Sequence, residues 1–113
     1  MRIFLDTANI SQIRQGAKLG VISGVTTNPS LVSKEGLADY KAVVKEICSI
    51  VSGPVSAEVV VNEAEAMLRQ AREIATWAAN VVVKIPSTTE GLEVISALAK
   101  ENIKVNMTLC FTL

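Results

Sequence analysis

The 113-residue sequence is long enough for one compact domain and too short for two. Lysine plus arginine and aspartate plus glutamate both number 11, so the chain lacks the basic excess of a nucleic-acid-binding protein, and its apolar runs are far shorter than the ~20 residues of a membrane span. There is no histidine, which excludes histidine-activated nucleophiles and histidine-ligated metals and leaves Lys, carboxylates, hydroxyls and Cys for any catalysis.

Short apolar runs, typical of buried strands, alternate with longer amphipathic ones from the N-terminus onward. The first predicted strand is Ile3–Leu5, followed by a helix from about Ile10 to Leu19 that ends at Gly20. A second short strand covers Val21–Thr26 and is ended by Asn28-Pro29.

The middle of the chain repeats this alternation. A long helix is predicted over roughly Leu37–Val51, with Gly53-Pro54 as its stop signal, and a third strand follows at Val55–Val61. Asn62 is the predicted N-cap of the next helix, which ends at about Trp77.

The last two strands enclose one further helix. Val81–Ile85 is the fourth strand, and the capping-box pattern Ser87-Thr88-Thr89-Glu90 opens a helix that runs to about Lys100. Asn102 closes that helix, and Ile103–Leu109 is the fifth strand.

The resulting β-α-β-α-β-α-β-α-β order and the Val/Ile-rich strands predict an α/β protein with a parallel sheet covered by helices. A repeat of about 25 to 30 residues fits either a doubly wound sheet or part of a (β/α)8 barrel. No Gly-rich GxGxxG follows the first strand, which weakens the dinucleotide-binding alternative.

Polar residues in or just after five successive strands favour the barrel. These residues are Asp6, Thr26-Thr27-Asn28, Glu58, Lys84, and Asn106 with Thr108. Residues two apart in a strand share a face, so inward-facing strands would bring these groups together near the C-terminal mouth, where barrel active sites lie.

Lys84 is the strongest single candidate because apolar residues that favour burial flank it on both sides. It could be a strand-end lysine whose ammonium group reaches water. Alternatively, a partly desolvated lysine has its charged form disfavoured, and the free amine can attack a carbonyl to form a Schiff base.

The other candidates have structural alternatives too. Glu58 lies among apolar neighbours and needs partners, and a structural ion pair with a lysine would supply one. Asp6 precedes a helix and could be a turn or N-cap residue, while Thr26, Thr27 and Asn28 could build a turn before Pro29.

The cysteines and the N-terminus suggest an intracellular protein. Cys48 and Cys110 lie far apart without CxxC spacing, so we expect reduced, buried thiols and neither a disulfide framework nor a metal site. The apolar run before Asp6 is shorter than the roughly 7–15 residues of a secretory h-region. We therefore expect a cytoplasmic location.

Five stretches in chain order resemble the successive signatures of transaldolases, most closely the small, single-domain microbial type. The stretches are Ile3-Phe4-Leu5-Asp6-Thr7-Ala8-Asn9, Gly24-Val25-Thr26-Thr27-Asn28-Pro29-Ser30-Leu31, Gly53-Pro54-Val55-Ser56-Ala57-Glu58-Val59, Val83-Lys84-Ile85-Pro86 and Asn106-Met107-Thr108-Leu109. The resemblance implies a class I aldolase (β/α)8 barrel, of which residues 1–113 supply about the first four and a half β/α units.

The resemblance also implies a reaction of the pentose phosphate pathway. Lys84 would attack the C2 ketone of fructose 6-phosphate or sedoheptulose 7-phosphate, and Asp6 would act as general base on the C4 hydroxyl so that the C3–C4 bond breaks. An aldose phosphate (erythrose 4-phosphate or glyceraldehyde 3-phosphate) would then accept the dihydroxyacetone unit. The protonated imine is the electron sink, so no metal or organic cofactor is implied.

The same resemblance assigns the remaining polar residues. Glu58 and Thr108 would hold a water that shuttles protons, while Asn28 and Asn106, with Thr26, would bind the substrate. The fructose 6-phosphate aldolase branch, which releases free dihydroxyacetone, is the alternative within the family. That branch typically carries Gln at the position of Glu58 and has a different fifth strand, so transaldolase is favoured.

The sequence departs from the family by ending after the fifth strand. The family's phosphate-binding arginine, its last three strands and the C-terminal helices used in assembly are not in these 113 residues. We expect a piece of a longer, homo-oligomeric enzyme. The alternatives are a half-barrel completed by another chain, and an inactive fragment that only self-associates.

Overall fold

The computed structural model describes residues 3–34, 39–61 and 63–108. Its centre is one sheet of five parallel strands in the order β1-β2-β3-β4-β5. The strands are β1 (Phe4–Asp6), β2 (Gly24–Thr26), β3 (Val55–Glu58), β4 (Val81–Pro86) and β5 (Val105–Thr108). Each strand pairs with its predecessor in the chain, as in a portion of a (β/α)8 barrel, whereas a doubly wound sheet reverses its order at a switch point. The predicted α/β barrel class is confirmed.

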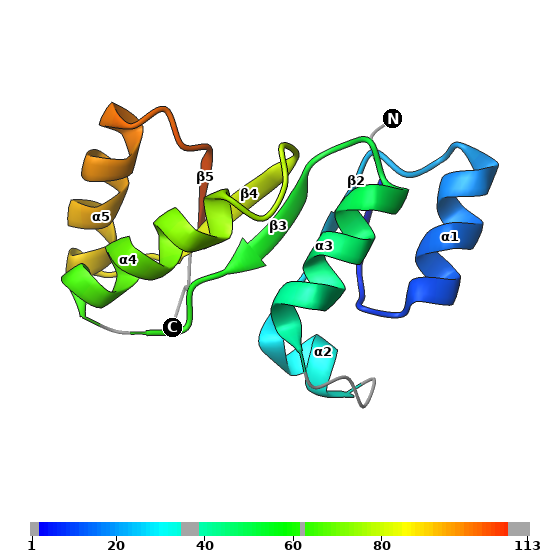
Figure 1. Ribbon diagram of the computed structural model, residues 1–113, viewed down its shortest axis with the longest axis horizontal. Coiled ribbons are helices and arrows are strands. Elements are labelled where there is room, and N and C mark those ends of the chain that lie inside the picture. Colours follow the sequence, from blue (N-terminus) through cyan, green and yellow to red (C-terminus); the bar gives the residue numbers. More distant parts are fainter. Residues whose placement is uncertain (1–2, 35–38, 62, 109–113) are drawn as a thin grey trace, which may run out of the picture.

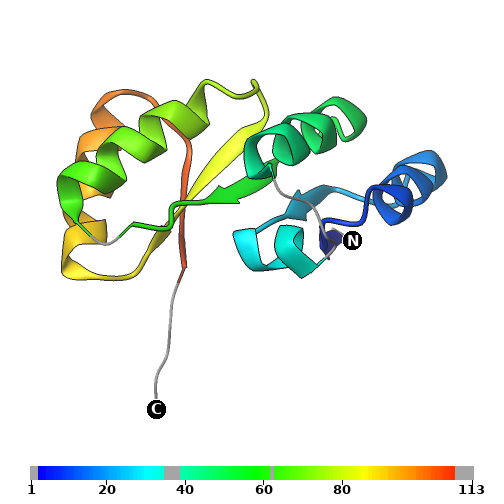
Figure 2. The same ribbon diagram turned by 60° about the horizontal axis from the view of Figure 1, so that its bottom comes forward.

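Helices connect the strands and cover one face of the sheet. They are α1 (Ile10–Leu19), α2 (Pro29–Lys34), α3 (Tyr40–Ile50), α4 (Ala64–Ala75) and α5 (Thr89–Lys100). Figure 1 shows α1, α3, α4 and α5 succeeding one another from right to left in chain order. In the turned view of Figure 2, α4 and α5 pack together at one end of the sheet and α1 lies at the other.

Alternation along β3 and β4 separates the two faces of the sheet. Val55, Ala57, Val83 and Ile85 are buried against the helices and belong to a core that also contains Ile47 of α3. The residues between them point to the opposite face, which no helix packs against in the described part of the chain. This second face would be the interior of a closed barrel, because in such a fold the helices form the outer ring.

The first helix ends as predicted, but the segment after β2 differs from prediction. Gly20 has φ +71°, a left-handed conformation that glycine adopts without strain. Asn28-Pro29, expected to end the second strand, also opens the short helix α2. The Asn28 side chain accepts a hydrogen bond from the Leu31 amide at 2.9 Å. Proline suits the first helical position because the amide hydrogen it lacks would have no partner there.

Other boundaries shift by a few residues. The long helix begins at Tyr40 rather than Leu37, with the Asp39 side chain accepting a hydrogen bond from the Ala42 amide, and residue 37 lies outside the described residues. The second strand begins at Gly24 rather than Val21, and the third ends at Glu58 rather than Val61.

The residues that cap α4 and α5 agree with the prediction only in part. The predicted N-cap Asn62 lies outside the described residues, and Glu63 occupies the cap position of α4 without a side-chain hydrogen bond. Thr88, not Ser87, caps α5 by accepting from the Gly91 amide at 3.0 Å. Asn102 closes α5 as predicted, with φ +59°.

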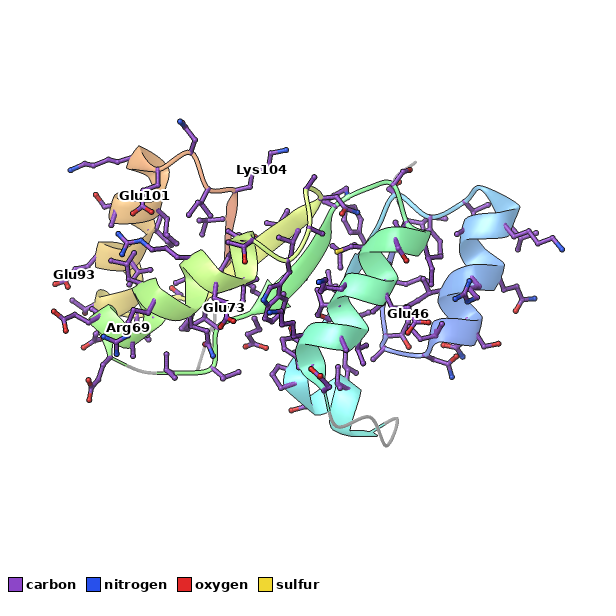
Figure 3. All side chains as sticks on the ribbon, viewed as in Figure 1. Glu46, Arg69, Glu73, Glu93, Glu101 and Lys104 are labelled. Carbon is purple, nitrogen blue, oxygen red and sulfur yellow. The ribbon has the colours of Figure 1, made fainter. Side chains whose placement is uncertain are left out.

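Charged residues line the exposed faces of the helices, as the labelled Glu46, Arg69 and Glu73 show in Figure 3. No helix in the described residues has the length and apolar character needed to cross a bilayer. The described residues likewise contain no group of three or more Cys, Asp or Glu arranged to hold a metal ion.

Candidate active site

The strand register places Glu58, Lys84 and Asn106 side by side. Glu58 pairs with Lys84 across β3 and β4, and Lys84 pairs with Asn106 across β4 and β5. Adjacent strands are spaced about 4.8 Å apart, and paired residues of parallel strands project to the same face. An amine, a carboxylate and an amide therefore form one row at the C-terminal end of the sheet, on the face away from the helices.

Lys84 and Glu58 are both half-buried. The ion pairs among the described residues lie on the helices and include neither of these two side chains, so the interpretation of Glu58 as one half of a structural ion pair gains no support. The strand register makes Glu58 and Lys84 neighbours across β3 and β4.

Asp6 and Thr26 form a second polar pair. Thr26 pairs with Ser56, two residues before Glu58, so this pair lies closer to the N-terminal ends of the strands than the row does. Their backbones pair across β1 and β2, and the Thr26 hydroxyl donates a hydrogen bond of 2.9 Å to Asp6 Oδ1. Asn9, not Asp6, caps α1 by accepting from the Gln12 amide. Asp6 is therefore oriented by a threonine and exposed, and the N-cap interpretation of it is wrong.

Asn28 lies beyond Thr26, at the start of α2. Its side-chain oxygen accepts the Leu31 amide hydrogen at 2.9 Å, which fixes the side chain at the turn. The amide NH2 group is the part that could face a ligand. The turn-building interpretation and the substrate-binding one are thus compatible for this residue.

Thr108 ends β5 opposite Pro86, two residues beyond Asn106. Its backbone is described and its side chain lies outside the described part of the structure.

A cavity of about 280 Å³ lies on the same face and extends from Asn106 toward the N-terminal ends of the strands. Its lining includes Phe4, Thr26, Ser56, Val82 and Asn106. The hydroxyl of Ser56 is buried and has no hydrogen-bond partner among the described residues, so it is a polar atom that a water or ligand would satisfy.

A larger cavity of about 430 Å³ lies at the opposite ends of the strands, between Cys48, Asn80 and Lys104. None of the predicted site residues lines it. Beside it, the Asn80 side chain donates to the backbone oxygens of Cys48, Val51 and Gly53 at 2.8 to 3.3 Å, which ties the end of α3 to the start of β4. Asn80 thus has a structural role.

Tyr40 is a residue near the site that the sequence analysis did not identify. Its hydroxyl lies 2.9 Å from Thr27 Oγ1 and accepts a hydrogen bond of 2.9 Å from the Glu58 amide. Burial raises the pKa of Tyr40, the charge of Glu58 adds to that rise, and the hydrogen bond from the Glu58 amide opposes it. In the sequence, Tyr40 is only a single tyrosine next to the helix cap Asp39, and no pattern indicates that it contacts Glu58.

Consecutive parallel strands thus carry an amine, two carboxylates and amides near their C-terminal ends, which is where barrel active sites lie. A family model described as "Transaldolase/Fructose-6-phosphate aldolase" matches residues 3–113. The chain belongs to this family.

Several curated relatives are similar over nearly the whole chain. A "Probable transaldolase" of Dehalococcoides mccartyi is 65% identical over 113 residues, which cover 99% of this chain and 52% of that protein. "Probable transaldolase" proteins of Roseiflexus sp. (strain RS-1) and Thermoanaerobacter sp. (strain X514) are 59% and 58% identical, over 98% and 99% of this chain and 51% of each relative. The chain spans about half the length of the curated relatives it matches.

Proposed function

We propose that residues 1–113 are the part of a transaldolase that carries the Schiff-base lysine, Lys84. A transaldolase transfers a dihydroxyacetone unit from a ketose phosphate to an aldose phosphate. The observation that carries the proposal is the register of β3, β4 and β5, which sets Glu58, Lys84 and Asn106 in one row at the C-terminal end of the sheet. Family membership and the names of the relatives support the same reaction class.

The first step forms a covalent bond to Lys84. The free amine attacks the C2 ketone carbon and gives a carbinolamine, which loses water to leave a protonated imine. Glu58 accepts and returns protons through a bound water during this gain and loss of water, and its neighbouring position across β3 and β4 suits that role. Thr108 is proposed to hold the same water.

The second step breaks the C3–C4 bond. Asp6 takes the proton of the C4 hydroxyl, the C4 carbon leaves as an aldehyde, and the bonding electrons move into the imine to give an enamine on Lys84. The Thr26 hydroxyl bonds one carboxylate oxygen of Asp6, which limits how the base can turn. Asn28 and Asn106 are proposed to hydrogen-bond the three-carbon unit that remains on the enzyme.

The transfer ends when the enamine attacks an acceptor aldehyde and water hydrolyses the new imine, which restores the Lys84 amine. Positioning of the reactants in this way lowers the barrier by several kcal/mol.

The family's other reaction releases free dihydroxyacetone, and an acceptor test separates the two. With fructose 6-phosphate alone, a transaldolase produces at most one equivalent of glyceraldehyde 3-phosphate per site, and turnover requires erythrose 4-phosphate. Continuous release of dihydroxyacetone without an acceptor would assign the chain to the aldolase branch. Turnover that survives in Lys84→Met would contradict both.

We further propose that residues 1–113 act within a longer barrel that assembles as a homo-oligomer in the cytoplasm. The longer barrel is supported by the length of the matching relatives, which are about twice as long as the matched segment. Sedimentation of the full-length protein tests the assembly, and a monomeric mass would contradict it.

A further inference from the structure

Tyr40 reaches from the first residue of α3 to the place where β2 ends beside β3. Its hydroxyl oxygen lies 2.9 Å from Thr27 Oγ1 and 2.9 Å from the backbone nitrogen of Glu58. Thr27 is buried, and its hydroxyl is also 2.7 Å from the backbone oxygen of Ser56. Four polar groups from three segments therefore form one hydrogen-bonded cluster on the helix side of the sheet.

The donors and acceptors of this cluster can be assigned from their chemistry. The Ser56 carbonyl only accepts, so the single hydroxyl hydrogen of Thr27 is donated to it. Thr27 Oγ1 must then accept from the Tyr40 hydroxyl, whose oxygen in turn accepts from the Glu58 amide. The result is a continuous relay from Glu58 N–H through Tyr40 and Thr27 to the Ser56 carbonyl.

The relay replaces a hydrogen bond between β2 and β3 that would form if β2 extended further. The Val25 and Thr27 amides donate to the carbonyls of Pro54 and Ser56, but β2 ends at Thr26 and the chain then turns into α2. No β2 residue is paired with Glu58, so its amide has no strand carbonyl on that side. The Tyr40 hydroxyl supplies the acceptor at the last residue of β3.

We propose that Tyr40 is a positioning residue that holds the backbone of Glu58, and through it the carboxylate, in register with Lys84. The inference rests on the proposed function, because it assigns Tyr40 to the proton-transfer steps of imine formation. Tyr40 lies on the helix side of the sheet and touches neither substrate nor reacting atoms. It acts only through Glu58.

Two further contacts fit this role. Trp77 packs edge-on against the Tyr40 ring, with 5.9 Å between ring centroids, and limits its movement. Burial also raises the pKa of Tyr40, which keeps the phenol protonated as the relay requires.

The test uses the full-length protein with fructose 6-phosphate and erythrose 4-phosphate. Tyr40→Phe removes the hydroxyl and keeps the ring, so we expect kcat to fall about tenfold while KM stays within about twofold. Thr27→Val should cause a similar loss, and Thr27→Ser, which retains the hydroxyl, should preserve activity. Ile47→Val is the matched control, because it trims the buried face of α3 without touching the relay, and it should leave kcat within about twofold.

A double-mutant cycle separates positioning from general loss of stability. In a Glu58→Gln background, Tyr40→Phe should cause no further fall in kcat, because the carboxylate it positions is already gone. Equal losses in both backgrounds, or Tyr40→Phe activity within twofold of the wild type, would overturn the inference and leave the proposed function intact. A wild-type protein without Lys84-dependent turnover would overturn both.

Discussion

The hydrogen bond from Thr26 to Asp6 offers a sharp test of how the general base is oriented. Thr26→Val is nearly isosteric and removes the hydroxyl that donates to Asp6 Oδ1 at 2.9 Å. A hydrogen bond to a charged group contributes about 1.5–3 kcal/mol. Because Asp6 is exposed, water replaces part of this, and we expect a loss of about 1–2 kcal/mol in transition-state stabilisation, or about 5- to 30-fold in kcat.

The assay is the coupled transfer of the dihydroxyacetone unit, with circular dichroism to show that the fold is retained. Thr26→Ser keeps the hydroxyl and should recover most of the activity. Thr76→Val is the matched control, since the Thr76 hydroxyl donates only locally to the Glu73 carbonyl on α4, away from the site. Equal impairment of the Val and Ser variants at position 26, or no impairment in either, would refute the reasoning.

Three further predictions concern stability. Asn80→Ala should lower the free energy of unfolding by about 1–3 kcal/mol in urea titrations, because backbone carbonyls lose their donor; an unchanged midpoint would contradict this. Gly53→Ala should destabilise by at least about 1–3 kcal/mol, because a Cβ would collide with the Ser23 carbonyl, and a neutral effect would contradict the close approach. Burial raises the pKa of Cys48 from 9.0 to about 11, so the stability gained from keeping the thiol neutral is present below pH 9 and is lost as the pH rises toward 11; Tyr40 acts in the same direction above pH 10. Cys48→Ala should flatten this decline between pH 9 and 11, and a decline of unchanged slope would rule out the thiol as its source.

The strand–helix alternation and the face of the sheet that carries the site residues were predictable, because both follow from local patterns. The alternation in Val81–Ile85 assigns Lys84 to the face opposite Val83, whose burial the structure confirms. The same rule places Glu58 and Asn106 on that face. The register between β3 and β4 could be inferred only by analogy with known barrels. No local pattern in the sequence specifies which residue of β3 lies beside Lys84.

Two kinds of detail were not predictable: which of two competing local signals applies, and which distant segments are in contact. Asn28-Pro29 is a strand-stop signal and also a good helix start, and only the hydrogen bond to Leu31 shows that the second applies. The Thr26–Asp6 bond depends on the pairing of β1 with β2. The Tyr40 relay requires α3 to dock across the ends of two strands, which no sequence window contains.

The central claim is that Lys84 forms a Schiff base with a ketose. Borohydride reduction of the full-length protein in the presence of fructose 6-phosphate, followed by intact and peptide mass spectrometry, tests it most directly. We expect a stable adduct on the peptide that contains Lys84, and no adduct in Lys84→Met. An adduct-free but folded full-length protein, or an adduct confined to a different lysine, would contradict it.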